Sequence, residues 1–175
     1  MENLISAYNG GSGPRSNNYS KNRFTNWSEY EPWWLEVQAI YKRFESRIAR
    51  KPAFPKLIEL APFEGFLRPC TALEVETQLR SCPADFLKGL RAVFILSGTK
   101  KQLKSWGCGR AFYGQYWNCC VFLHAHPFGQ ADLNWIHRFY LRDVLMHEVG
   151  HHVDLRNTAK KDREQFAQRF ARIHG

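Results

Sequence analysis

The sequence predicts an α+β domain in which a small sheet lies between N-terminal and C-terminal helices. Apolar residues recur at helical spacing after residue 31 and again after residue 133, and three short apolar runs between residues 91 and 126 read as strands. With 175 residues, of which 44% are hydrophobic, the chain is long enough to bury one core. We therefore expect a single domain over residues 31–175.

The first thirty residues are expected to form a flexible tail, because residues 9–25 are rich in Gly, Ser and Asn and offer little to bury. A helix is expected from Pro32, since apolar residues follow at helical spacing from Trp33 to Ile48 and proline suits a first helical turn. Prolines at positions 52, 55 and 62 then predict an irregular connection.

Further along the chain, local signals predict two short helices, a sheet and two longer helices. Thr71 and Glu74 form a capping-box pattern, and Pro83 can open a second helical piece. Strands are expected over 91–96, 110–117 and 119–126, and helices over 133–155 and 159–173.

Composition and charge bear on partners and location. The net charge of +9 raises nucleic acid as a partner, but basic residues exceed acidic ones evenly along the chain, so this is the less favoured alternative. No export signal and no run long enough to span a membrane is visible, so we expect a cytoplasmic protein without a membrane partner. Five cysteines without CxxC spacing predict reduced thiols rather than disulfides.

The stretch "LMHEVGHHVDL" at 145–155 carries the functional signal. On a helix, His147 and His151 share one face and can present two imidazoles to one ion, while Glu148 lies one step round the helix. A catalytic Zn2+ site needs three protein ligands and an open position for water, so a third ligand must come from elsewhere.

Glu164 is the best candidate for the third ligand. It falls at the edge of an apolar arc on the last helix, and the small residues Ala167 and Ala171 would let that helix approach the metal-bearing helix closely. The alternative is that Glu164 only complements the dipole in the first helical turn. The arc consists of Phe166, Ala167, Phe170, Ala171 and Ile173.

Neighbouring polar residues leave several roles open. Asp154 could be an alternative third ligand, hold a ligand imidazole by a hydrogen bond, or be a solvated residue. His152 points about 100° away from His151, so a surface or supporting role is expected. Gly150 is costly inside a helix, which suggests close packing against another element.

Two further pairs of side chains could belong to the same site. His124 and His126 share one face of the third predicted strand and could flank a cleft, or be ordinary half-buried strand residues. Tyr113 and Tyr116 could donate hydrogen bonds to the reacting group, or belong to the core.

Together, His147-Glu148-Val-Gly-His151-His152 and the later Glu164-x-x-Ala167-x-x-Phe170-Ala171 resemble the gluzincin class of zinc metallopeptidases. The similarity is greatest to the small ImmA/IrrE-type and neutral zinc metallopeptidase families and covers about residues 110–173. It implies a minimal zincin-like domain, with a small mostly antiparallel or mixed sheet packed on the metal-bearing helix. It also implies Zn2+ bound by His147, His151 and Glu164, with Glu148 as general base. The departures are a connection of only twelve residues before Glu164, and Gln168 where many relatives have an acidic or amide residue.

We therefore expect a zinc-dependent metallopeptidase acting on a peptide or protein substrate, which the strand 119–126 could hold by strand addition. One alternative is a deformylase-like zinc amidase, with Cys108, Cys119 or Cys120 as third ligand. Another is a non-catalytic basic module that binds a partner or nucleic acid.

Overall fold

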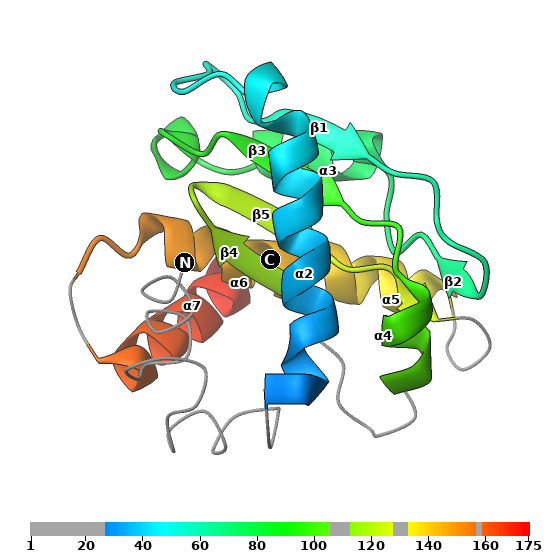
Figure 1. Cartoon of the computed structure of the whole chain (residues 1–175). Helices are drawn as coiled ribbons and strands as arrows, with labels where there is room; N and C mark the ends of the chain where they lie inside the picture. Colours follow the sequence, from blue (N-terminus) through cyan, green and yellow to red (C-terminus); the bar gives the residue numbers. More distant parts are fainter. Residues whose placement is uncertain (1–26, 106–112, 128–132, 157–158) are drawn as a thin grey trace.

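The computed structural model of the chain describes residues 27–105, 113–127, 133–156 and 159–175 (Figure 1). Within them it has an α+β architecture with one small mixed sheet, as the sequence predicts. In chain order the elements are α2 (Trp27–Phe44), η2 (Glu45–Arg47), β1 (Lys56–Glu59), β2 (Phe66–Leu67), α3 (Ala72–Arg80), η3 (Ala84–Leu87), β3 (Ala92–Ile95), α4 (Lys100–Ser105), β4 (Gly114–Trp117), β5 (Cys120–Leu123), β6 (His126–Pro127), α5 (Leu133–Arg138), η5 (Phe139–Leu145), α6 (Met146–Val153) and α7 (Lys160–His174).

The main sheet has the strand order β1–β3–β5–β4. β1, β3 and β5 are parallel, and only β4 runs antiparallel to its neighbour, so the expectation of a mostly antiparallel sheet is wrong and that of a mixed sheet is confirmed. Long connections containing helices join the parallel strands, as parallel pairing requires. A tight turn joins β4 to β5, with positive φ at Asn118 and Cys119 (52° and 55°), as in two-residue hairpins.

Strand β5 lies inside the sheet, which corrects the prediction for residues 119–126. β5 pairs with β3 on one side and with β4 on the other, so its backbone has no free edge for an added peptide. The predicted strand is also split, because β6 separates from it and pairs with β2. Among the described strands of this sheet, β4 and β1 form the two edges.

Strand β1 and helix α4 were not predicted. β1 lies between Pro55 and Pro62, where the prolines suggested an irregular connection, and of its four residues only Ile58 is buried. Its place in the sheet depends on pairing with β3, a contact distant in sequence that local patterns do not encode. By contrast, Thr71 and Glu74 form the predicted capping box at the start of α3, and η3 follows Pro83.

Helices cover both faces of the sheet (Figure 1). α2 lies on one face, where Trp33, Trp34 and Val37 pack against Phe94 and Phe122. It begins at Trp27, so residues 27–30 of the predicted tail are helical and Pro32 lies inside the helix rather than in its first turn. The rest of that tail, residues 1–26, lies outside the described residues. The other face is covered by α3, η3 and the C-terminal helices.

The predicted helix over 133–155 ends at Val153, and its middle part, η5, is π-helical. Because hydrogen bonds in a π-helix reach five residues back instead of four, each turn holds more residues and positions four apart stay in line. One such line faces the interior. It consists of the buried residues Ile136, Tyr140, Val144 and Glu148.

Helix α7 packs on α6, as the small residues predict. A Cβ placed on Gly150 would lie only 2.9 Å from the Ala167 Cα and 3.1 Å from the Phe170 Cβ. Ile173 is exposed, so the predicted apolar arc of α7 is too wide at its C-terminal end. Within the described part of the chain, no helix is both long and apolar enough to cross a bilayer.

Candidate metal centre

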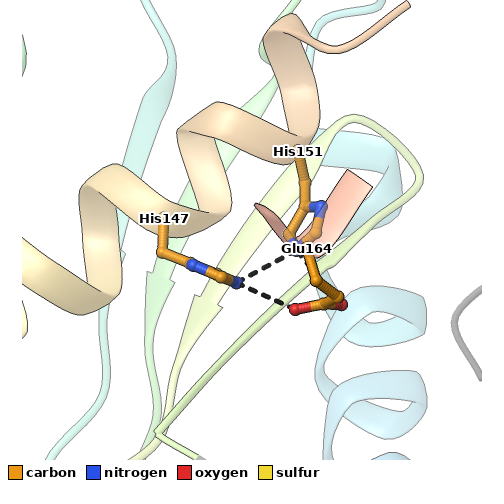
Figure 2. A group of neighbouring side chains, drawn as sticks. All are labelled: His147, His151 and Glu164. Atoms are coloured by element: carbon orange, nitrogen blue, oxygen red, sulfur yellow. Dashed lines mark hydrogen bonds and ion pairs between the residues drawn. The ribbon is translucent and has the colours of Figure 1, made fainter. Parts of the chain in front are cut away.

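His147 and His151 lie one helical turn apart on α6 and turn toward the same point (Figure 2). Their Nε2 atoms are 3.1 Å apart, and their ring planes are nearly perpendicular. This is the arrangement that four-residue spacing on a helix predicts.

Glu164 reaches the same point from the second turn of α7 (Figure 2). Its Oε2 lies 3.4 Å from the His147 Nε2, and its Oε1 lies 3.6 Å from the His151 Nε2. Across the described ranges, these three residues form the one group of His, Cys, Asp or Glu side chains with potential ligand atoms within 4.8 Å of one another. The structure thus brings together the three side chains that the sequence predicts as metal ligands.

The spacing of the three donors fits a small tetrahedral ion. Ligand atoms about 2.0–2.1 Å from a tetrahedral zinc must lie roughly 3.4 Å from one another by simple geometry. The three observed separations are 3.1, 3.4 and 3.6 Å. Two imidazoles and one carboxylate can therefore hold Zn2+ and leave its fourth position for water or substrate.

The close approach of α6 and α7 places Glu164 at the histidines. Gly150 precedes His151 directly and lies against Ala167, which is one turn after Glu164 on α7. Residues three apart on a helix share a face, so the contact at Ala167 also directs Glu164 toward α6. Contact between the backbones of the two helices at Gly150 thus fixes the distance that the carboxylate must bridge.

Burial and charge suit the histidines to metal binding. Burial lowers the pKa of His151 to about 4, and the Glu164 carboxylate opposes this shift, so the imidazole is neutral and can use a lone pair at neutral pH. The group remains open on one side, because the side chains of His147 and Glu164 are 25% and 42% exposed. Solvent and small molecules can therefore reach the donor atoms.

Glu148 is buried one step round the helix from His147 and lies against the edge strand β4. A Cβ on Gly114 would lie 3.0 Å from both the Cγ and the Oε1 of Glu148, and 2.6 Å from the Val144 Cγ1. The glycine thus leaves the room that the Glu148 side chain occupies. Sequence reasoning missed this role, although a glycine inside a strand pattern often marks a close approach.

His152 and Tyr116 support each other instead of entering the metal group. The His152 Nε2 lies 3.1 Å from the carbonyl oxygen of Lys88, so this nitrogen carries the proton and donates it. The Nδ1 then accepts a hydrogen bond from the Tyr116 hydroxyl at 2.9 Å. His152 therefore ties α6 to β4 and to the segment after η3. The Tyr116 proton is committed to this bond, which argues against its predicted role as a donor to the reacting group.

Asp154 is bound to Arg156, which differs from each of the three roles that the sequence left open for it. Its Oδ1 accepts hydrogen bonds from the backbone N–H and the Nε of Arg156 at 3.2 and 2.7 Å, and its Oδ2 accepts one from the guanidinium at 3.1 Å. The Asp154 side chain is only 1% exposed, and the residue does not belong to the group of potential metal ligands. The carboxylate instead stabilises the turn that ends α6.

His124 lies on the opposite face of the sheet, under α2, so it does not flank the metal group. Its Nδ1 is 3.3 Å from the Glu36 Oε2, and its Nε2 is 3.1 Å from the Gln115 Nε2. Glu36 also accepts hydrogen bonds from the backbone of Gly98 and the side chain of Gln102. This buried polar network was not predicted, because Glu36 reads from the sequence as an outward-facing helix residue.

His126 and Tyr113 are packing residues near the start of β4. Their rings are stacked, and the His126 Nδ1 donates a hydrogen bond to the Pro127 carbonyl at 2.9 Å. Tyr113 also packs edge-on against Phe139 and Tyr140, as expected if this tyrosine belongs to the core.

The described cysteines are free thiols, and none of them belongs to the group around His147. Cys119 and Cys120, two of the proposed deformylase-type ligands, lie in the β4–β5 turn and at the start of β5. The third, Cys108, lies outside the described residues.

Comparisons with family models, with curated proteins and with solved structures give no match to this chain. The assignment of the site therefore depends on the residues and distances given above.

Proposed function

We propose that this protein is a cytoplasmic, zinc-dependent metallopeptidase with a zincin-like domain. The observation that supports it most is the triangle of donor atoms from His147, His151 and Glu164, with edges of 3.1–3.6 Å. Glu148, the residue after His147, adds a buried carboxylate, and metal-assisted amide hydrolysis uses such a group as its general base.

When bound there, Zn2+ supplies a water whose pKa is lowered to about 7 and an electrophile that polarises the substrate carbonyl. Glu148 accepts the proton of the attacking water and passes it to the leaving amine. Its side chain is buried against Gly114 of β4, so little ordering of the carboxylate is needed during the reaction. The products are a free carboxylate and a free amine.

The edge strand β4 is the element of the sheet that can align a peptide with this machinery. Gly114 on β4 contacts Glu148, and Tyr116 on β4 bonds to His152, so the strand follows α6 along the metal-bearing turns. An extended peptide could add to the outer edge of β4 and present its backbone to the donor group. This role replaces the one predicted for 119–126.

The experiment that tests this function is peptide hydrolysis by the zinc-loaded full chain and by a Glu148→Gln variant. We expect the variant to keep its zinc and to lose hydrolysis by at least a hundredfold, because its amide cannot accept the water proton. His147→Ala is the companion variant, which should lose both zinc and activity. Wild-type rates in Glu148→Gln would refute the mechanism. A folded wild-type protein that binds nucleic acid but no zinc would favour the non-catalytic module.

A further inference from the structure

The helical segments α5, η5 and α6 follow one another without a break, and a line of residues with solvent exposure runs along them to His147 and His151. From residue 135 to residue 151, every fourth residue is exposed or half-buried. In an α-helix of 3.6 residues per turn, a step of four residues overshoots the turn by about 40°. The larger π-helical turn of η5 removes much of this drift, so the line stays on one side. Its members are Trp135, Phe139, Asp143, His147 and His151.

The end of this line away from the metal group is aromatic. Trp135 stacks on Phe139 with ring centroids 5.0 Å apart and planes 5° from parallel. Tyr113 meets Phe139 edge-on, also at 5.0 Å. We call Trp135, Phe139 and Tyr113 the aromatic shelf. Its outer ring, Trp135, is 48% exposed, so the stacked pair presents a flat apolar face to solvent.

The shelf continues directly into the candidate active site. Tyr113 immediately precedes Gly114, which contacts Glu148, and Phe139 precedes His147 by eight residues on the same helix. Eight residues advance a helix by about 12 Å at most, at 1.5 Å per residue. Trp135 precedes His147 by twelve residues, or about 18 Å at most. An extended peptide advances about 3.3 Å per residue, so the shelf lies roughly three to five residues from the metal group.

We propose that the aromatic shelf binds an aromatic or large apolar side chain of the peptide substrate, roughly three to five residues from the bond that is cleaved. This inference rests on the proposed peptidase function and adds a substrate class to it. The rings offer a flat apolar surface to such a side chain, while the peptide backbone passes along β4. The shelf is continuous with Gly114 and His147, so a peptide that lies along β4 at the candidate metal group also reaches the shelf. We therefore expect a side chain of that peptide to occupy it.

The test compares cleavage profiles of a degenerate peptide library, read by mass spectrometry, for the zinc-loaded wild type and Trp135→Ala. The wild type should enrich Phe, Tyr, Trp or Leu at one fixed position roughly three to five residues from the cleavage site. In Trp135→Ala this enrichment should fall roughly tenfold, whereas Trp135→Phe should keep most of it. Phe63→Ala is the matched control, because Phe63 is an aromatic residue of similar exposure (42%) that lies outside the metal-bearing helix.

A binding readout separates recognition from chemistry. Immobilised Glu148→Gln protein, which keeps the metal ligands, should capture library peptides enriched in the same residues. The double variant Glu148→Gln/Trp135→Ala should lose that enrichment while holding the same amount of zinc. An unchanged profile in Trp135→Ala, with hydrolysis intact, would overturn the shelf alone. Failure of the zinc-loaded wild type to hydrolyse any library member would overturn the proposed function, and the substrate subsite with it.

Discussion

Gly150 of α6 and Ala167 of α7 lie in direct contact, since a Cβ on Gly150 would lie 2.9 Å from the Ala167 Cα. The nearest atom is backbone, which cannot rotate away as a side chain can. The position of Glu164 relative to His147 and His151 therefore depends on a residue that binds nothing itself.

Gly150→Ala should destabilise the protein and weaken zinc binding. Alanine at an open helical position gains about 1 kcal/mol over glycine. Here the added methyl group must push α7 away, at a cost of about 1–3 kcal/mol that opposes this gain. Zinc affinity should fall roughly tenfold as Glu164 moves away from the histidines. Denaturant unfolding and competition with a chelator measure the two effects, with Gln165→Ala on the exposed side of α7 as control. A Gly150→Ala variant more stable than the wild type would contradict the contact.

Gly114→Ala should lower hydrolysis and leave zinc in place. The new Cβ would meet Val144 and Glu148 at 2.6–3.0 Å, so the carboxylate must move, while the metal ligands lie elsewhere. We expect kcat/KM to fall at least tenfold, because misplaced catalytic groups are costly. Adding Val144→Ala opens space beside the new methyl group and should restore part of the activity. Full activity in Gly114→Ala would show that Glu148 does not need its observed position.

Tyr116→Phe tests whether the Tyr116 hydroxyl stabilises the fold or takes part in catalysis. The change removes the donor to the His152 Nδ1 and should cost about 1 kcal/mol of unfolding free energy. It should change kcat less than twofold, because the hydroxyl does not act on the reacting group. A large fall in kcat with unchanged stability would instead support the transition-state role that the sequence left open.

The buried His126 predicts a loss of stability at acidic pH. Burial lowers the pKa of His126 below its usual value of about 6.5, so the unfolded chain binds a proton at a higher pH than the folded protein does. The free energy of unfolding must then fall as the pH drops below about 6.5. His126→Phe keeps a ring against Tyr113 and removes the titration, so its stability should depend less steeply on pH between about 7 and 5. Denaturant unfolding of the metal-free proteins at several pH values measures the slopes, and equal slopes would refute the assignment.

The candidate site could be predicted further from the sequence than the sheet could. His147 and His151 are one helical turn apart, and a single short connection leads to Glu164, so local periodicity sets most of their geometry. The order of the strands depends on pairings between distant segments, and β1 is a four-residue strand with a proline near each end. Sequence periodicity of 3.6 residues also gave no sign of the π-helical segment.

Two polar residues show why side-chain roles near the site were harder to predict. Glu36 has its partners on α4 and after β5, so nothing in its local sequence marks it as buried. Asp154 has its partner only two residues away, but the sequence also allowed it to face the histidines. For both residues the hydrogen-bond partner decides the role of the side chain, and which partner lies within reach depends on the fold.

Zinc stoichiometry is the most direct test of the metal centre. The purified full chain should hold one zinc ion per molecule, His147→Ala should hold none, and Glu164→Ala should bind zinc at least tenfold more weakly. Elemental analysis after dialysis and titration with zinc give these values, and circular dichroism of each variant checks that it is folded. A folded wild-type chain without zinc, or a Glu164→Ala variant with wild-type affinity, would contradict the site built from His147, His151 and Glu164.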